Sequence, residues 1–434
     1  MSQLLRCVQF VQIAHIYVQK DSIFMGYNNA RSTGGRSGGG GGGGYGGGRR
    51  AGSFSYPRQK SRGPAKEYIN PTRFISKAKE VEVVAYEPQH LFIDFAVDSL
   101  IHDNLEAKGF VAPTPIQDQA VPAGLEGRDI VGIADTGTGK TAAFAIPMLQ
   151  RLLDDEKAKV LVMAPTRELA QQIEEECRTI GKGTGLRSVL LIGGVAIGPQ
   201  FRDLRANPRV IIGTPGRIQD HMEQGTLDIS DVSIVVLDEV DRMLDMGFII
   251  PIREILSKVP TEGRQSFFFS ATMDPRVRGI IDGFTKDPLH VMVKSGETAD
   301  SVEQNVVEYR GNIDKIDKLH QLLITDKVTK AVIFDDTQRA VERLSEELLA
   351  RGFKTDAIHG GKSQSQRQRA LKRFKESDVT VLVATDVAAR GIDIKDISHV
   401  VNYSTPQSYS DYVHRVGRAG RAGRTGYALT FIEQ

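Results

Sequence analysis

Cysteine is scarce in this sequence, because its 434 residues include only Cys7 and Cys177. Neither belongs to a CxxC pair and neither lies near a pair of histidines, which argues against a zinc site and against a disulfide framework. Long apolar runs are also missing, since none approaches the roughly 18 residues that a membrane-spanning helix needs. These absences predict a soluble protein in a reducing compartment, and we expect a cytoplasmic location.

The first 24 residues contain many apolar side chains but do not resemble a secretion signal. Gln9, Gln12 and His15 interrupt the apolar run, and no small-residue cleavage site follows it. Met25 lies directly before a segment of quite different composition. Our hypothesis is that translation begins at Met25, which makes residues 1–24 a start-site extension.

Acidic residues are absent between Asp21 and Glu67, in a stretch dominated by glycine. Such a composition cannot bury enough apolar surface to offset chain entropy, so residues 1–66 are predicted to form a disordered tail. Between residues 26 and 66, eight basic side chains are interleaved with four aromatic ones. Basic groups displace counterions from a phosphate backbone and rings stack on unpaired bases, which favours an auxiliary RNA-binding tail. The alternative is a flexible linker.

The chain as a whole has little net charge to indicate a partner. Lysine and arginine total 56 and acidic residues 54, which leaves +2 over all 434 residues. From about residue 90, short apolar runs alternate with amphipathic stretches, and a second such series begins near residue 306. This alternation predicts two α/β domains, each a parallel sheet with helices on both faces, at 91–294 and 306–434. Residues 295–305 are predicted to link them, and residues 67–90 to be a linker that packs loosely on the first domain.

The segment ADTGTGKT, residues 134–141, has the context of a phosphate-binding loop, because it follows a strand-like run and opens a helix-like one. Glycine N–H groups can wrap an anion, Lys140 can reach the terminal phosphates, and Thr141 can ligate magnesium. A glycine-rich turn of a Rossmann-like domain is the alternative. The nucleotide-binding residues predicted here are Thr136, Gly137, Thr138, Gly139, Lys140 and Thr141.

The segment VVLDEVD, residues 235–241, places two acids at the end of an apolar run, 98 positions after Lys140. Asp238 can hold magnesium through water, and Glu239 can orient or deprotonate an attacking water. Alone, two acids after a strand are a weak signal; together with the phosphate-binding loop they predict an ATP-hydrolysing site. Further upstream, Gln117 can contact an adenine edge and Phe92 can stack on the ring.

The order of these segments resembles that of the DEAD-box RNA helicases, from about residue 91 to the end of the chain. The first half contains PTPIQ, ADTGTGKT, APTRELA, a glycine pair, TPGR, DEVD and SAT. The second half contains VIFDDT, HGGKSQSQR, TDVAARGID and HRVGRAGR. The resemblance implies two RecA-like domains, ATP and magnesium as cofactors, RNA as the partner, and a bacterial-type helicase with DEVD in place of the name-giving tetrad.

The resemblance also implies residue roles. Arg418 and Arg421 would act as arginine fingers across an interdomain cleft, and Asp393 would contact the ribose. RNA contacts are expected from Pro165, Thr166, Arg167, Gly193, Gly194, Thr214, Pro215, Gly216, Arg217, Gln364, Arg367 and Thr385. Coupling of hydrolysis to domain closure is expected from Asp241, Ser270, Ala271, Thr272 and His414. Because such groups suit phosphates and 2′-hydroxyls better than base edges, sequence preference should be weak.

Among the features that depart from the family pattern, two concern packing. Val240 stands where relatives usually have alanine, and its two extra methyl groups predict an effect on packing rather than on chemistry. Many relatives continue through further helices after the final strand, so we expect one face of the second sheet to be thinly covered or to be covered by another segment.

The sequence leaves more than one activity open. The leading hypothesis is an ATP-dependent RNA helicase that separates short duplexes. An ATP-controlled RNA clamp or annealing chaperone is the alternative, since the same hydrolytic residues serve both. A DNA helicase is disfavoured by the expected glycine and threonine contacts.

Overall fold

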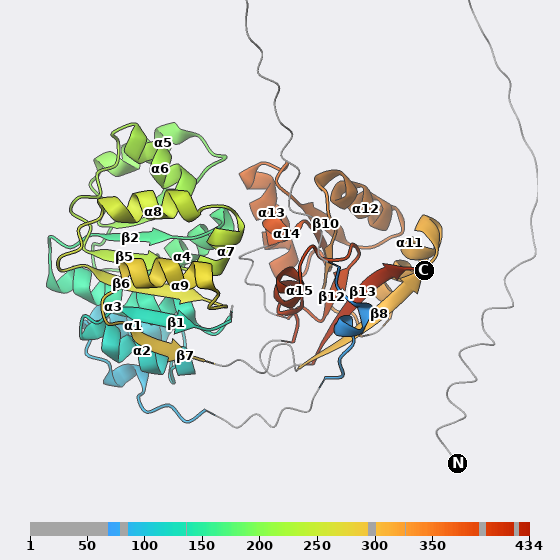
Figure 1. The fold of residues 1–434 in the computed structure, drawn as a ribbon, viewed down its shortest axis with the longest axis horizontal. Helices are drawn as coiled ribbons and strands as arrows, with labels where there is room; N and C mark the ends of the chain where they lie inside the picture. Colours follow the sequence, from blue (N-terminus) through green and yellow to red (C-terminus); the bar gives the residue numbers. More distant parts are fainter. Residues whose placement is uncertain are drawn as a thin grey trace, which may run out of the picture. The chain divides into compact units, whose positions relative to one another are not determined.

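The computed structural model describes residues 68–78, 86–135, 137–293, 301–325, 327–389, 396–420 and 425–434 (Figure 1). The predicted disordered tail, its proposed RNA-binding role and the start-site hypothesis all concern residues outside these ranges. The described residues form two α/β lobes. We call residues 86–293 the first lobe and residues 301–434, together with 68–78, the second lobe.

The first lobe is built on a seven-stranded parallel sheet in the order β3-β4-β2-β5-β6-β1-β7. Its central strands are apolar runs that are buried on both faces, which is the pattern that parallel sheets require. The strands are β1 Ile130–Ile133, β2 Val160–Met163, β3 Ser188–Leu191, β4 Val210–Gly213, β5 Ile234–Leu237, β6 Gln265–Ser270 and β7 Leu289–Met292.

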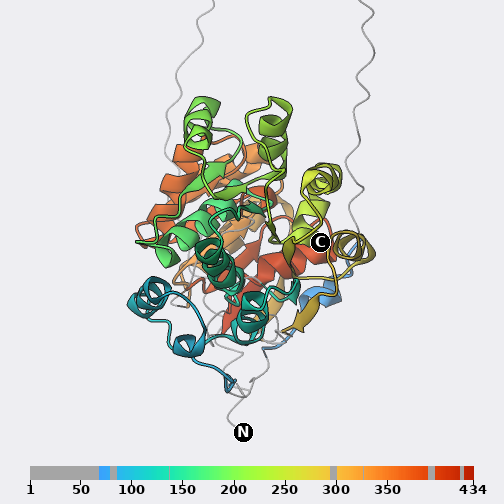
Figure 2. The ribbon, with the colours of Figure 1, turned by 90° about the vertical axis from the view of Figure 1, so that its left-hand side faces the viewer.

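Successive residues of β2 enter different cores on the two faces of this sheet. Val160 and Val162 belong to one buried cluster, and Leu161 and Met163 to the other. Helices α1 to α4 cover the first cluster and α6 to α9 the second, on opposite sides of the strands (Figure 1 and Figure 2). The helical elements are η3 Phe92–Asp94, α1 Ser99–Ala107, α2 Pro115–Leu125, α3 Lys140–Asp154, α4 Arg167–Ile180, α5 Ile197–Arg205, α6 Pro215–Glu223, α7 Val240–Asp245, α8 Ile249–Lys258 and α9 Pro275–Phe284.

The second lobe contains a six-stranded parallel sheet in the order β10-β11-β9-β12-β13-β8. Its strands are β8 Val302–Tyr309, β9 Ala331–Phe334, β10 Thr355–Ile358, β11 Val381–Ala384, β12 His399–Asn402 and β13 Gly426–Glu433. Its helical elements are η2 Pro71–Phe74, α11 Gly311–Leu323, α12 Gln338–Ala350, α13 Gln364–Lys375, α14 Asp386–Ala389 and α15 Tyr409–Val416. Helices again pack on both faces, so the predicted fold class is confirmed.

The predicted boundary of the interdomain linker was wrong at residues 302–305, because these residues begin β8. Val302 pairs with Gly426 in parallel register, and its side chain is fully buried. Gln304 is also buried, while Glu303 and Asn305 are exposed. The alternation was hidden in the sequence because one of the inward-facing positions is a polar glutamine.

The linker prediction for residues 67–90 was wrong at its N-terminal end. Ile69 and Phe74 are buried in the core of the second lobe, and Ser76 forms an antiparallel bridge with Gln304. The Phe74 ring lies 4.7 Å from that of Tyr412. Thus η2 packs on β8 and β13, and it is the covering segment that the sequence left unidentified.

The other described end of that segment, residues 86–90, lies on the first lobe as predicted. Tyr86, Gln89 and His90 all hydrogen-bond to Asp118 of α2. The two ends of residues 67–90 therefore belong to different lobes. None of the described helices combines the length and apolar character needed to cross a bilayer.

Candidate nucleotide and RNA site

The phosphate-binding loop connects β1 to α3, as its sequence predicts. Gly137 and Gly139 have positive φ angles of 86° and 93°, a backbone conformation that favours glycine. A Cβ atom on Gly139 would also lie only 2.4 Å from Nε2 of Gln117. The backbone conformation therefore favours glycine at this position, and a Cβ atom would displace the Gln117 amide. Thr136 lies outside the described residues.

Lys140 begins α3 and directs its ammonium toward the loop and the neighbouring strand. Its Nζ donates a hydrogen bond to the carbonyl of Ala134 at 3.1 Å and lies 4.0 Å from Oδ1 of Asp238. Thr138 closes the loop by donating its hydroxyl to the carbonyl of Asp135 at 2.8 Å. Thr141, the predicted magnesium ligand, follows in the first turn of α3 and is half-buried.

Asp238 and Glu239 directly follow β5 and are both buried. Burial raises the pKa of Asp238 to about 6, with the Lys140 charge opposing the rise and the Glu239 charge adding to it. Glu239 has φ 55°, a left-handed conformation that is uncommon outside glycine and often marks functional positions. Its Oε2 makes no hydrogen bond with any described residue, so a buried acceptor is left for a water or ligand.

The predicted coupling residues are brought together by β6 and α7. Asp241 accepts hydrogen bonds at Oδ2 from the Thr272 backbone at 3.0 Å and from its hydroxyl at 3.1 Å. The Ser270 hydroxyl accepts from the Asp241 backbone N–H at 3.3 Å. Ala271 lies between these two partners in the chain. These bonds join the acid tetrad to the end of β6, although the coupling role itself stays a prediction.

Gln117 lies in the first turn of α2, beside the phosphate-binding loop. Its Oε1 accepts from the Thr114 backbone at 2.8 Å, and its Nε2 donates to the Gly139 carbonyl at 3.0 Å. Phe92 is only 4% exposed, because its ring packs edge-on against Phe95 and next to Phe110. The ring of Phe92 is therefore largely a core group in this structure, and its stacking on adenine stays a prediction.

The predicted RNA contacts of the first lobe gather at the carboxyl ends of the adjacent strands β2, β3 and β4. Arg167 begins α4 after β2, and its guanidinium fills the space over Gly194, where a Cβ atom would lie 1.8 Å from Nη1. The Thr214 N–H donates to the Leu191 carbonyl at 3.0 Å, which ties β4 to β3. The other members at these strand ends are Pro165, Thr166, Gly193, Pro215, Gly216 and Arg217.

The predicted RNA contacts of the second lobe include two buried side chains on α13. Gln364 donates from Nε2 to Glu168 at 3.2 Å and to Gln171 at 3.1 Å, both on α4 of the first lobe. Arg367 forms an ion pair of 2.7 Å with Glu168. Helices α4 and α13 are thus in contact, although Glu168 and Gln364 are 196 positions apart in the chain. Thr385 directly follows β11 and donates its N–H to the Ile358 carbonyl at 3.3 Å.

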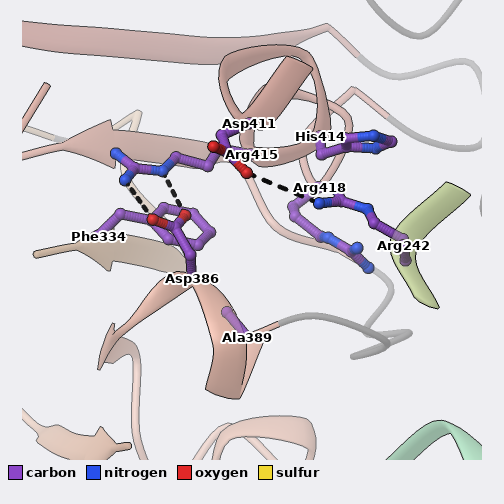
Figure 3. Close-up of a pocket in the computed structure, with 8 residues that line it drawn as sticks. All are labelled: Arg242, Phe334, Asp386, Ala389, Asp411, His414, Arg415 and Arg418. Carbon is purple, nitrogen blue, oxygen red and sulfur yellow. Dashed lines mark hydrogen bonds and ion pairs between the residues drawn. The ribbon is translucent and has the colours of Figure 1, made fainter. Parts of the chain in front are cut away.

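Helix α15 and the turn after it carry the remaining described candidates, His414 and Arg418, which line a small pocket with Arg242 of the first lobe (Figure 3). Arg242 lies 3.8 Å from Asp411 of α15. The second predicted arginine finger, Arg421, and the predicted ribose contact, Asp393, lie outside the described residues.

Sequence reasoning missed Arg415, which anchors α15 to the second sheet. Its guanidinium forms two 2.6 Å bonds with the carboxylate of Asp386 and lies 5.0 Å from the centroid of the Phe334 ring (Figure 3). A bidentate arginine–carboxylate pair fixes orientation as well as distance. Both residues lie inside motifs that the sequence identified, but their spacing of 29 positions carries no local signal.

A phosphate-binding loop, an acid pair on a nearby strand and a second lobe of the same architecture define the class of two-lobed P-loop nucleotide hydrolases. The sequence profile of the DEAD/DEAH box helicase family matches residues 114–280, and that of the helicase conserved C-terminal domain matches residues 314–423. The chain belongs to the DEAD-box ATP-dependent RNA helicase family, as its curated relatives show.

Two of these relatives are bacterial. The chain is 45% identical to the DEAD-box ATP-dependent RNA helicase CshA of Bacillus subtilis over 343 residues, which cover 79% of this chain and 69% of the relative. For CshA of Bacillus licheniformis the identity is also 45% over 343 residues, covering 79% and 70%. Among solved structures, S. cerevisiae Dbp5 bound to RNA and ADP BeF3 is similar with a TM-score of 0.70 and 30% identity, covering 79% of this chain and 89% of that one. This likeness confirms the RecA-like architecture of both lobes.

Proposed function

We propose that this protein is an RNA-dependent ATPase that separates short RNA duplexes by closing its two lobes around ATP and single-stranded RNA. The observation that carries the proposal is the buried carboxylate of Glu239, whose Oε2 has no hydrogen-bond partner among the described residues. Glu239 directly follows Asp238, which lies 4.0 Å from the Lys140 ammonium. A buried acceptor next to a phosphate-binding loop suits the orientation of an attacking water.

Several residues of the first lobe have separate roles in ATP hydrolysis. Lys140 binds the terminal phosphates, and Glu239 orients or deprotonates the water. The oxygen donors of Thr141 and Asp238 fit magnesium, which usually takes one or two protein ligands and substrate phosphates. When bound, the ion neutralises charge on the phosphates.

In this proposal, residues of both lobes contact the base, the ribose and the γ-phosphate of the nucleotide. Gln117 reads the adenine edge and Phe92 offers ring surface to the base, which requires a small movement from its buried position. Asp393 contacts the ribose. Arg418 and Arg421 act on the γ-phosphate from the second lobe, so hydrolysis depends on closure. Asp241 and Thr272, with their direct hydrogen bonds, transmit closure between the acid tetrad and β6.

RNA is bound through its backbone in this proposal. The glycines and threonines at the ends of β3 and β4 offer N–H and hydroxyl groups, and Arg167, Arg217 and Arg367 offer guanidinium groups, which suit phosphates and 2′-hydroxyls. Arg367 of the second lobe forms an ion pair with Glu168 of the first lobe, which supports an RNA-binding surface shared by both lobes. RNA phosphates would compete with the Glu168 carboxylate for the Arg367 guanidinium. Little base preference is expected. The glycine- and arginine-rich tail adds nonspecific affinity.

A strand-separation assay tests the function directly. A short RNA duplex with one labelled strand should separate faster with ATP than with ADP, and the rate should fall when Lys140 is replaced by alanine. If strands instead pair faster and never separate, the protein is an ATP-controlled clamp or annealing chaperone. ATPase stimulation by DNA as strong as by RNA would contradict the choice of RNA.

Two further expectations belong to this proposal. The predicted division into two domains at 91–294 and 306–434 is kept, with the second domain extended by the β8 residues 302–305 and by η2. A cytoplasmic location is supported by the scarcity of cysteine in the chain. Cell fractionation with detection of the native protein tests that location.

A further inference from the structure

Asp118 is a buried acid that none of the family motifs explains. It lies in α2 directly after Gln117 and is 3% exposed. Its carboxylate oxygens receive bonds from three residues that precede it by 28 to 32 positions. They are the Tyr86 hydroxyl at 2.6 Å, the Gln89 backbone at 2.8 Å, the His90 backbone at 3.1 Å and His90 Nδ1 at 2.8 Å.

The chemistry of this cluster requires a carboxylate. The Tyr86 hydroxyl and the two backbone N–H groups donate, and His90 donates in the tautomer that carries its proton on Nδ1. An ionised carboxyl group is an acceptor only, so both oxygens can be fully used. Hydrogen bonds to an ionised acceptor are stronger than neutral ones. Burial alone would raise the pKa of Asp118, but the donors of Tyr86, Gln89 and His90 outweigh burial and lower it. An asparagine in its place would turn one NH₂ group toward these donors.

The segment held by Asp118 leads directly to Phe92. Two residues after His90, the Phe92 N–H donates to the Val111 carbonyl at 3.3 Å, and the ring enters the cluster with Phe95 and Phe110. The Leu91 N–H donates to Asp94 at 2.6 Å, which fixes the start of η3. The position of this turn therefore depends on where Asp118 holds residues 86–90.

Successive residues of α2 thus reach two sides of the expected adenine site. Gln117 is tied to the phosphate-binding loop through Gly139, and Asp118 is tied to the segment before Phe92. If Asp118 served only to attach residues 86–90, it would not need to lie next to the adenine-reading amide. Because Gln117 and Asp118 are adjacent in one turn of α2, the distance between the two sides of the expected adenine site is fixed.

We propose that Asp118 is a positioning residue for adenine recognition, holding residues 86–90 so that Phe92 and Gln117 keep the spacing that an adenine base requires. The inference rests on the proposed function, because it assigns ATP to this site. Asp118 does not touch the nucleotide; it acts through Phe92.

The test compares Asp118→Asn with the wild-type chain and with Asp98→Asn, a matched control at the exposed N-cap of α1. RNA-stimulated ATPase activity is measured against ATP and GTP concentration. For Asp118→Asn the KM for ATP should rise about tenfold with kcat within about twofold, and the preference for ATP over GTP should shrink by a similar factor. The control should keep both values.

A folded Asp118→Asn variant with unchanged KM and unchanged base preference would overturn the inference. If this variant does not fold, a Tyr86→Phe, His90→Ala double variant removes two of the donors while leaving the carboxylate in place. An unchanged ATP-to-GTP preference in the double variant would equally overturn it, and a reduced preference supports it.

Direct binding separates this inference from the function on which it rests. Displacement of a fluorescent ATP analogue by unlabelled ATP and GTP measures base preference without hydrolysis. If the wild-type chain binds ATP selectively but shows no RNA-stimulated hydrolysis, the proposed function fails. Loss of that selectivity in Asp118→Asn would still support the positioning role, and its retention would contradict it.

Discussion

The ammonium of Lys140 lies 4.0 Å from the carboxylate of Asp238, although 98 positions separate the two residues. Both side chains are buried, so the attraction between their charges holds the phosphate-binding loop near the end of β5. Removing one partner would leave the other charge buried and unpaired, which is costly. The pair therefore links the phosphate-binding loop to the end of β5, where Glu239 follows Asp238.

Replacing Glu239 with glutamine should stop turnover and leave the fold intact. The amide keeps the shape of the side chain but loses the base, and loss of a general base typically lowers kcat by about 10²–10⁴-fold. ATP and RNA should remain bound together for longer. RNA-stimulated phosphate release and retention of labelled RNA measure the two effects. Glu262→Gln, at an exposed site, is the matched control, and normal turnover by Glu239→Gln would exclude the catalytic assignment.

Replacing Val240 with alanine should affect stability more than chemistry. The side chain is fully buried in the cluster that packs under α7, and it makes no part of the phosphate site. Loss of two buried methyl groups should cost about 1–3 kcal/mol of unfolding free energy. Denaturant unfolding and ATPase assays check this. A large fall in kcat without loss of stability would show that Val240 acts on the chemistry.

Replacing Phe74 with alanine should destabilise the second lobe. The ring is 1% exposed in that lobe's core, and a buried Phe→Ala change typically costs about 3–5 kcal/mol. Ile75→Ala is the neighbouring control, because Ile75 is 57% exposed. Limited proteolysis followed by mass spectrometry reports which lobe opens. Equal protection of the two variants and the wild-type chain would mean that η2 is only loosely attached.

Acid should destabilise the second lobe through His399. Burial, assisted by the charge of Lys327, lowers the pKa of this histidine to about 4 from its ordinary value near 6.5. Between these values the unfolded chain binds a proton that the folded chain does not. The histidine contribution to unfolding free energy is therefore complete above about pH 6.5 and is lost as the pH falls toward 4.

The measurement is the slope of unfolding free energy between about pH 7 and pH 5, a window that lies mostly between the two pKa values. His399→Gln should flatten this slope, whereas His290→Gln, at an exposed position of β7, should leave it unchanged. An equal slope in His399→Gln and wild-type protein would mean that His399 is protonated in the fold.

Deleting residues 26–62 should weaken RNA binding and make it less sensitive to salt. The deletion removes seven basic side chains, and for single strands the salt slope should fall by about 0.7 for each phosphate that is no longer neutralised. Basal ATPase activity should not change. A glycine and serine tail of equal length is the control. Equal RNA affinity of the wild-type chain, the deletion and the glycine and serine control at low salt would mean that the tail acts only as a linker.

Much of the site could be predicted because its motifs are local. A strand, a glycine-rich turn and a helix starting with Lys140 follow one another within a few residues, and Asp238 directly follows an apolar strand. The alternation of apolar and amphipathic segments likewise predicted both parallel sheets. The sequence prediction failed where the alternation of apolar and polar residues was weak. At the start of β8, a polar residue, Gln304, occupies an inward-facing position.

Local sequence shows which chemical groups are present and which strand or helix end carries each, since these depend on neighbours along the chain. The contacts of Phe74 in the second lobe, of Arg415 with Asp386 and of Asp118 with residues 86–90 are visible only in the packed fold. Such contacts join segments tens of positions apart, and many partners of similar chemistry compete for each side chain. Their choice is made by the packing of whole sheets and helices, which excludes all but one set of neighbours.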